Sequence, residues 1–387
     1  MISIIKDAIS EREKIFSAVS EKVDVSATVS EIIDTVRREG DAALYRYAER
    51  FDKAHLTSLK VSEEEIREAV DSVDEEFIEI LKEAAENIRE FHEKQKNSGF
   101  EIKKENGIII GQKVVAVDVA GLYVPGGTAA YPSTVLMDAI PAKIAGCGRV
   151  VMTTPPSKEG KVNPVILAAA YVAGVDEIYK IGGAQAIAAL AYGTETVPKT
   201  DKIVGPGNAF VAEAKRQVYG TVSIDMIAGP SEIMVIADAK NRPCDIAADL
   251  LSQAEHDRMA SAVLVTDSEE FALEVSREIE KQIPTLLRAE IARASIATYG
   301  KIIITDSLES AVEIANGIAP EHLELCVDEP FRYLEKVRHA GSVFLGRYCP
   351  EALGDYFAGT NHTLPTSGTA RFSSPLSVDD FVKKTQY

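Results

Sequence analysis

The stretch VVAVDVAGLYVPGG, residues 114–127, opens the part of the chain that decides the fold. It ends in glycine, and the helical segment STVLMDAIPAKIAGC (133–147) follows it. The same alternation continues through RVVMTTPP (149–156), VILAAAYVAGV (165–175) and EIYKIGG (177–183). Short apolar runs that are closed by Gly or Pro and separated by helical segments are typical of a parallel sheet with crossover helices. The stretch therefore predicts an α/β fold.

A second α/β unit is predicted after AGPSEIMVIAD, residues 228–238. Its expected elements alternate in order: helix 245–256, strand 261–267, helix 269–283, strand 301–306, helix 307–318 and strand 323–327. The first hundred residues differ, because they are rich in Glu and Lys. Ser62 and Glu65 have the spacing of a capping box, and residues 75–96 repeat apolar residues at helical spacing. This part is predicted to be a helical scaffold.

Composition limits the functional classes. A chain of 387 residues suggests two or three domains. Its net charge of -18 argues against a general nucleic-acid binder. The longest apolar run, residues 165–175, is too short to span a bilayer, and the first ten residues lack a signal-peptide core. The four cysteines form no C-x-x-C pair. A cytoplasmic protein with no nucleic-acid or membrane partner is expected.

Three glycine-rich loops are candidate ligand sites. They are YVPGG (123–127), IGGAQ (181–185) and GPGNAF (205–210), and each follows an expected strand. Ligands of open α/β sheets gather where strands end, and glycine lets the backbone approach a phosphate. None of the loops is a G-x-G-x-x-G fingerprint or a Walker loop. At each place a phosphate loop and a plain tight turn remain equally good interpretations.

The stretch DLLSQAEHD, residues 249–257, carries two polar groups on an otherwise apolar helix. Gln253 and His256 are three residues apart, which places them on one side of a helix. The two side chains can serve a metal, or they can satisfy each other.

Two other histidines lie close in sequence to an acidic residue. Glu321 and His322 are neighbours just ahead of a strand, where carboxylate and imidazole can divide acid and base duties. Asp355 and His362 share a Gly- and Thr-rich stretch, 354–366. Taken together, these groups favour a metal site over purely structural roles.

The remaining histidines are interpreted as structural. His55 and His92 lie in the helical scaffold, and His339 is expected near a helix end. From the residues alone, the chain is an α/β enzyme whose use of metal and nucleotide remains open.

Five motifs, in family order, resemble the histidinol dehydrogenase family. They are GLYVPGG (121–127), GPGNAFVAEAKRQV (205–218), the long segment 223–256, APEHLEL (319–325) and GDYFAGTNH (354–362). The resemblance implies NAD-linked oxidation of L-histidinol through the aldehyde to L-histidine, the last steps of histidine biosynthesis. Two NAD molecules would be used for each histidinol.

The resemblance also implies a zinc and substrate site. Gln253, His256 and Asp355 would bind both zinc and substrate, and Ser231 would contact the substrate. Imidazole and carboxylate are ordinary zinc ligands, whereas an amide oxygen is unusual. The metal would hold the substrate's imidazole and amine as a template rather than activate water.

The implied catalytic and cofactor residues complete the site. His322, which would also contact the substrate, would remove the hydroxyl proton, and Glu321 would activate the water that adds to the aldehyde. Tyr123, Gln185 and Asn208 would contact NAD. These three lie in the glycine-rich loops, so both lines of reasoning point to the same places.

The family's architecture implies two incomplete Rossmann-like parallel-sheet domains, one inserted in the other, in an intertwined homodimer. The expected bounds are: 1–20, N-terminal helical segment; 21–122 and 231–375, zinc- and substrate-binding domain; 123–230, inserted NAD-binding domain; 376–387, start of a C-terminal domain. The family normally continues past DDFVKKTQY (379–387) into a helical domain that supplies a zinc-ligating histidine and a substrate-contacting glutamate across the dimer. For the chain as written, weakened metal affinity and impaired turnover are expected.

Three alternatives stay open. The enzyme could oxidise another polar primary alcohol with NAD. It could be a zinc hydrolase in which Glu321 activates water without nicotinamide. The chain could also be a non-catalytic subunit or binding module, which would tolerate substitution of His322 by Asn.

Overall fold

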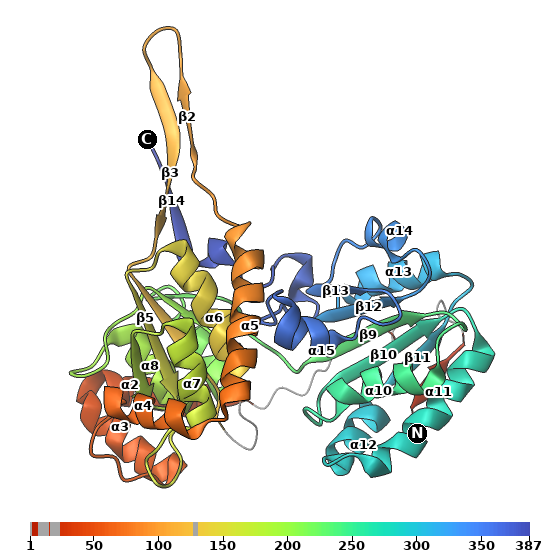
Figure 1. The fold of residues 1–387 in the computed structure, drawn as a ribbon, viewed down its shortest axis with the longest axis horizontal. Coiled ribbons are helices and arrows are strands. Elements are labelled where there is room, and N and C mark those ends of the chain that lie inside the picture. Colours follow the sequence, from red (N-terminus) through yellow and green to blue (C-terminus); the bar gives the residue numbers. More distant parts are fainter. Residues whose placement is uncertain (1, 7–14, 16–23, 127–130) are drawn as a thin grey trace. The chain divides into compact units, whose positions relative to one another are not determined.

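The computed structural model describes residues 2–6, 15, 24–126 and 131–387. Contacts divide the chain into two compact units (Figure 1). The first unit comprises Met1–Lys22, Ala228–Gly354 and Leu364–Pro375; the second comprises Val23–Ile227, Asp355–Thr363 and Leu376–Tyr387. Each unit is built on its own parallel sheet, which confirms the predicted fold class.

In the described part of the first unit, six strands form one parallel sheet. From edge to edge they are β1 (Ser3–Ile5), β11 (Lys301–Ile304), β10 (Ser261–Thr266), β9 (Glu232–Ala237), β12 (His322–Cys326) and β13 (Ser342–Leu345). The central strand β9 follows Pro230 and reads EIMVIA, an apolar run without polar alternation. Such runs belong to strands that are buried on both faces.

Helices cover both faces of this sheet. Ile233 and Val235 of β9 pack in one apolar cluster with α10 (Pro243–Ala254), α11 (Glu269–Gln282) and α12 (Ala289–Thr298). Met234 and Ile236, which alternate with them, pack in another cluster with α13 (Leu308–Ile318). Figure 1 shows the two groups of helices on opposite sides of the strands. The period of two along a strand sends successive side chains to opposite faces.

The second unit contains a five-stranded parallel sheet. Its order is β6 (Glu177–Lys180), β5 (Arg149–Thr154), β4 (Val119–Tyr123), β7 (Lys202–Val204) and β8 (Ser223–Ile224). One face is covered by α4 (Glu63–Ser72), α5 (Glu75–Glu93), α6 (Pro132–Ala145) and α7 (Pro164–Ala173). The other is covered by α2 (Ser26–Glu39), α3 (Asp41–Tyr47), α8 (Gly183–Tyr192) and α9 (Ala209–Val218).

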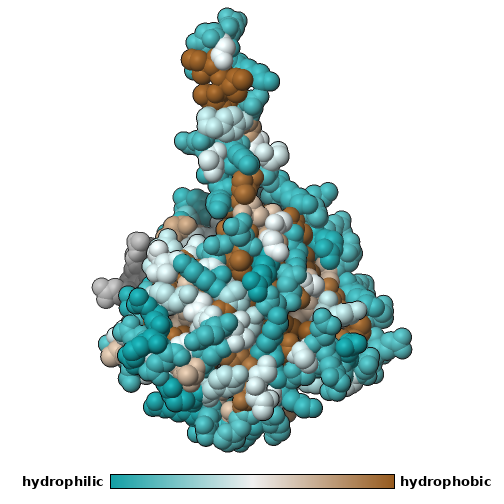
Figure 2. Space-filling view, turned by 90° about the vertical axis from the view of Figure 1, so that its left-hand side faces the viewer, coloured by the Kyte–Doolittle hydropathy of each residue, from teal (hydrophilic) through white to brown (hydrophobic). Residues whose placement is uncertain are grey.

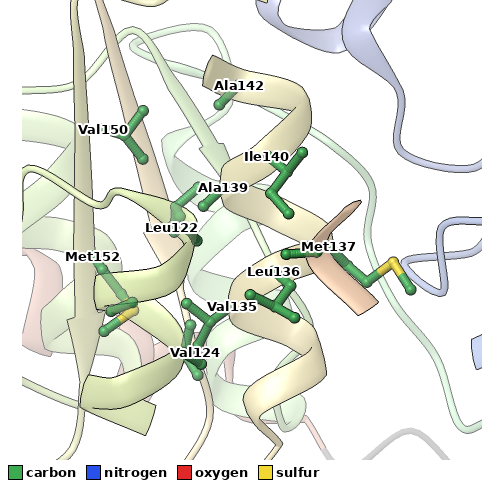
Figure 3. Packing of buried hydrophobic residues seen from close by; sticks show 14 of the residues in the cluster. Leu122, Val124, Val135, Leu136, Met137, Ala139, Ile140, Ala142, Val150 and Met152 are labelled. Atoms are coloured by element: carbon green, nitrogen blue, oxygen red, sulfur yellow. The ribbon is translucent and has the colours of Figure 1, made fainter. Parts of the chain in front are cut away.

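The contact of α6 with this sheet illustrates the packing. Figure 3 shows Val135 and Ala139 of α6 beside Leu122 and Val124, at the end of β4. All four side chains are fully buried. Complete burial of a Val or Leu side chain contributes about 1.5–3 kcal/mol. The sheet's central strands are therefore held firmly, and the loops at their carboxyl ends begin from a rigid base.

A small antiparallel sheet belongs to the second unit as well. It contains β14 (Val382–Gln386), β3 (Ile109–Ala116) and β2 (Phe100–Lys103) in that order. The β2–β3 hairpin projects from its unit (Figure 1), and Figure 2 shows apolar atoms near its tip. Exposed Ile102, Ile108, Ile109 and Ile110 lie in this hairpin.

Two segments differ from the sequence-based expectation. Within the expected N-terminal helical segment 1–20, Ser3–Ile5 form strand β1, which pairs with β11. The strand is short and its partner is almost 300 residues away, so no local pattern identifies it; residues 7–14 and 16–20 lie outside the described part of the chain. Residues 378–386, expected to begin a further domain, form a 3₁₀ turn (Val378–Phe381) and β14.

The contact units also group the chain differently from the expected domains. Residues 24–122 pack with the 123–227 segment rather than with the first unit. Residues 59–61 run antiparallel beside β6, where the Val61 N–H donates to the Ile178 carbonyl and the Lys180 N–H to that of Leu59. Among the described residues, no helix combines the length and apolar character needed to cross a membrane.

Candidate functional site

His322 opens strand β12 in the first unit. The preceding α13 ends at Ile318, and its C-cap Ala319 has a left-handed backbone (φ 57°) that turns the chain toward the strand. The imidazole is 3% exposed, and its Nδ1 lies 3.0 Å from the backbone oxygen of Glu232. A carbonyl oxygen can only accept, so Nδ1 carries the proton and Nε2 is the basic nitrogen.

Glu321 lies beside this imidazole. Its Oε2 accepts a 2.9 Å hydrogen bond from the Glu232 N–H, and the same oxygen is 3.7 Å from Nδ1 of His322. The Glu321 side chain is buried. The backbone of one residue, Glu232 at the start of β9, therefore orients both members of the predicted acid–base pair. Ser231, the expected substrate contact, directly precedes that residue and is half-buried.

Gln253 lies in the last turn of α10, and His256 follows the end of the helix. Gln253 is 2% exposed in the last turn, and its Oε1 has no hydrogen-bond partner among the described residues. The helix ends at Ala254, so His256 lies in the following turn, exposed, with its N–H donating to the Gln253 carbonyl. A buried, unpartnered amide oxygen costs free energy, which a cation could offset.

Asp355 and the previously unpredicted Glu351 share one helical stretch. Glu351 belongs to α15 (Glu351–Leu353), and Asp355 to the π-helical turn Gly354–Ala358 that continues it. Four residues apart, they lie on one side of the turn. His322, Glu351 and Asp355 each offer a ligand atom, and these atoms lie within 4.8 Å of one another. Nε2 of His322 is 3.9 Å from Oε1 of Glu351.

A pair of buried carboxyl groups supports this arrangement. Asp249 lies one turn before Gln253 on α10 and is hydrogen bonded to Glu324 of β12. Glu324 in turn accepts a 2.8 Å hydrogen bond from the Glu351 N–H. Burial raises the pKa of Asp249 to about 6, and burial together with Asp249 raises the pKa of Glu324 well above its usual range. The hydrogen bond between the two carboxyl groups therefore joins α10 to β12, and the Glu351 N–H joins α15 to the same strand.

Glu232 has a perturbed acidity of its own. Burial raises the pKa of its carboxyl group to about 7, despite a hydrogen bond from the Ser367 N–H. A carboxyl group that titrates near neutrality beside an imidazole is common at catalytic sites.

Sequence reasoning missed four acids: Asp249, Glu232, Glu324 and Glu351. Two signals were available. Glu351 and Asp355 have helical spacing, and Glu324 interrupts the apolar run LELCV. An acid in such a run is rarely buried without a partner.

The three predicted cofactor residues all lie in the second unit, at carboxyl ends of strands. Tyr123 ends β4, and its hydroxyl accepts a 3.1 Å hydrogen bond from the Gly183 N–H. Gln185 is in the first turn of α8, after β6, and is 3% exposed. Asn208, after β7, is exposed and caps α9, because its Oδ1 accepts from the N–H groups of Phe210 and Val211.

The other histidines have separate surroundings. His362 is in the second unit, 3.3 Å from the Thr134 hydroxyl. His92 is fully buried in α5 and contacts Gln95 and Asn361, while His55 is exposed. His339 lies in a loop, where its N–H donates to Asn316. None of these belongs to the described group of His322, Glu351 and Asp355; nor does His256.

Comparisons with known proteins give one consistent family. The family model described as histidinol dehydrogenase matches residues 17–387. The histidinol dehydrogenase of Clostridium acetobutylicum is 57% identical, covering 100% of this chain and 91% of the relative. That of Geobacillus kaustophilus is 59% identical over 92% of this chain and 84% of the relative. The crystal structure of histidinol dehydrogenase from Elizabethkingia anophelis superposes with a TM-score of 0.96 at 41% identity, covering 100% of this chain and 90% of that one.

Proposed function

Because this chain belongs to the histidinol dehydrogenase family, oxidoreductases of histidine biosynthesis, we propose that it is a zinc-dependent, NAD-linked enzyme. The reaction is the four-electron oxidation of L-histidinol through L-histidinaldehyde to L-histidine. The observation that carries this proposal is the convergence of His322, Glu351 and Asp355 on one point.

His322 is the proposed base for the alcohol. Its Nδ1–H is bonded to the Glu232 carbonyl, so Nε2 is the nitrogen that accepts the substrate's hydroxyl proton. Loss of this proton gives the oxygen the alkoxide character that expels a hydride from the carbinol carbon. The same imidazole would serve again when the hydrated aldehyde loses its second hydride.

Glu321 is the proposed base for the hydration step. Its carboxylate takes a proton from the water that adds to the aldehyde carbon, which yields the hydrate. The Glu232 N–H holds Oε2 of this carboxylate and thereby sets its direction. Ser231, adjacent to Glu232, would contact the bound substrate.

These side chains suit a zinc ion. The carboxylates of Glu351 and Asp355 lie in one group with His322, and the buried Oε1 of Gln253 is an oxygen donor without a partner among the described residues. The exposed His256, which lies outside that group, would add an imidazole. We assign the metal to Gln253, His256 and Asp355, with Glu351 as an additional donor, and keep His322 as the base. When bound, zinc supplies a template that fixes the substrate's imidazole and amine.

Tyr123, Gln185 and Asn208 are the proposed NAD-binding residues. They follow three strands of one parallel sheet at its carboxyl edge, where dinucleotides bind in related folds. Because Oδ1 of Asn208 is engaged by α9, its amide N–H group is the part that would donate to the cofactor. Bound NAD supplies the hydride acceptor, and two molecules are needed for four electrons. We further propose that the enzyme acts as a homodimer in the cytoplasm.

The test is histidinol-dependent formation of NADH by the purified, zinc-loaded chain. Two NADH and one histidine should form for each histidinol consumed. Faster turnover of a sulfonated alcohol or a simple diol would favour another alcohol substrate. Hydrolysis without NAD reduction would favour a zinc hydrolase.

A substitution separates an enzyme from a binding module. His322→Asn keeps a side-chain N–H for the Glu232 carbonyl but has no basic nitrogen, so kcat should fall about a thousandfold with little change in the histidinol KM. His55→Asn, at an exposed histidine, is the matched control. A loss of less than about tenfold would contradict the assignment of His322 as base.

A further inference from the structure

The second unit contains a buried ion pair that the proposed chemistry does not use. Lys215 of α9 pairs with Asp225, and their side chains are 2% and 1% exposed. Removing two charges from water is costly, and replacing such a pair with apolar residues often leaves stability unchanged or improved. Stability alone therefore does not account for the pair.

Both side chains bind the backbone of the same residue, Gly205. The ammonium of Lys215 donates to the Gly205 carbonyl at 2.9 Å, and Oδ2 of Asp225 accepts from the Gly205 N–H at 2.8 Å. Lys215 and Asp225 thus fix both polar groups of one glycine. A bond from each side leaves the local backbone little freedom to rotate.

The backbone of Gly205 is closely surrounded on its remaining side. Its φ is +115°, and a Cβ built there would lie 2.1 Å from the carbonyl oxygen of Tyr123. A side chain would therefore push the chain away from the end of β4. Only glycine permits both this approach and the two hydrogen bonds.

Gly205 begins the loop 205–208, which ends at Asn208. The loop is held at its far end by Asn208, whose Oδ1 caps α9 at 3.1 and 3.2 Å. Lys215 is on the same helix, so one rigid element supports both ends of the loop. Side chains of α9 and of its N-cap therefore bond to both ends of the loop.

A second carboxyl group borders the pair. Asp138 of α6 is fully buried, and its Oδ2 lies 3.0 Å from the Cβ position built on Gly205. Burial and the nearby Asp225 raise the pKa of Asp138 well above its usual range, and its Oδ1 accepts from the Thr363 hydroxyl.

We propose that Lys215 and Asp225 are positioning residues that hold the loop 205–208 in the conformation that receives the dinucleotide. The proposal rests on the proposed NAD-linked function. Neither side chain touches the cofactor, because both are buried and bonded to the loop backbone. Their effect is on cofactor affinity rather than on the chemistry at His322.

The test compares three variants of the full chain with the unaltered chain. Lys215→Met combined with Asp225→Asn removes both charges, so that no unpaired charge remains buried. Gly205→Ala displaces the loop but leaves the ion pair in place. Lys202→Met is the matched control, because Lys202 is a buried lysine at the opposite end of β7 and pairs with Asp380. NAD binding is measured by calorimetry, alongside KM for both substrates, zinc content and Tm.

The double variant and Gly205→Ala should each raise the NAD Kd and KM about tenfold, the effect of losing one well-placed hydrogen bond. The histidinol KM and zinc content should not change, and Lys202→Met should bind NAD normally. An unchanged NAD Kd in the double variant, or an equal rise in Lys202→Met, would overturn the proposal. If the double variant does not fold, an unchanged Kd in Gly205→Ala overturns it. Failure of the unaltered chain to bind NAD would overturn the proposed function as well.

Discussion

A few individual residues orient the polar side chains of this site, which an ordinary apolar α/β core does not contain. The backbone of Glu232 sets the direction of both Glu321 and His322, so the geometry of the proposed catalytic pair depends on a residue that need not react. Side-chain identity at Glu232 matters less to this arrangement than the position of its peptide group. The opposite holds at Glu351, where the side chain itself faces the imidazole.

Glu351→Gln is expected to weaken zinc binding. The amide keeps the size of the side chain but removes a negative charge within 4.8 Å of the His322 and Asp355 donors. Zinc affinity should fall roughly 10- to 100-fold, the range seen when supporting groups of metal sites are altered. Competition with a chromophoric chelator measures this, and Glu309→Gln, at a 43% exposed glutamate, is the control. Equal zinc affinity in the two variants would remove Glu351 from the metal site.

Asp52 makes stability depend on pH. Burial raises the pKa of its carboxyl group to about 6 from 3.8, and its Oδ2 has no partner among the described residues. The folded state binds this proton more tightly, so the stabilisation is full below pH 3.8 and is lost as pH rises through 6.

Asp52→Asn should therefore stabilise the protein above neutral pH. We expect a gain of about 1–2 kcal/mol at pH ~8 and almost none at pH ~4, because the native carboxyl is already protonated there. Thermal melting at the two pH values measures the difference, with Asp306→Asn at an exposed aspartate as the control. A stabilisation of the same size at both pH values would show that the charge is not its cause.

At the scale of helices and strands, local patterns predicted most of the fold. The strands β5, β6, β10 and β11 and their crossover helices match the apolar runs and glycine ends of the sequence. The short strand β1 could not be predicted, because its stability comes from a partner distant in sequence. The proximity of Glu351 to His322 could not be predicted for the same reason, because the two residues are distant in sequence and meet only in the folded chain.

The position of the site along the strands was only half predictable. Tyr123, Gln185 and Asn208 lie at carboxyl ends, as ligand sites of open α/β sheets do. Glu321 and His322 instead lie where β12 begins. No rule based on alternating elements identifies that edge. The adjacent carboxylate and imidazole ahead of a strand indicated the pair, and the family resemblance implied the role of each residue.

The capping box of α4 was predicted from sequence and is confirmed. The Ser62 hydroxyl accepts from the Glu65 N–H at 3.1 Å, and the Glu65 carboxylate accepts from the Ser62 N–H at 2.9 Å. Ser62→Ala should cost about 1 kcal/mol, because one N–H of the first turn loses its partner. Urea unfolding followed by circular dichroism measures this, with Ser98→Ala at an exposed loop serine as the control. Identical urea midpoints for the two variants would mean that water replaces the capping hydrogen bond without loss of stability.

At the scale of the whole molecule, the sequence predicted two parallel-sheet units but not the grouping of residues 24–122. Their apolar faces identify helices without identifying which sheet they cover. The pairing of residues 59–61 with β6 decides this, and it joins segments more than 100 residues apart. Periodicity within a helix contains no information about such a partner.

The proposed NAD-binding residues and most of the proposed zinc-site residues lie in different units. All three proposed NAD contacts belong to the second unit, whereas Gln253, His256, His322 and Glu351 belong to the first; of the proposed zinc ligands, Asp355 alone is grouped with the second unit. Chelation should therefore lower histidinol oxidation by about a hundredfold or more, and added zinc should restore it. The NAD Kd should stay within about twofold. A metal that does not favour one conformation of the NAD site over another cannot change the affinity of that site for NAD. Calorimetry on the chelated chain measures this, and loss of NAD binding along with zinc would mean that metal and cofactor share one cooperative site.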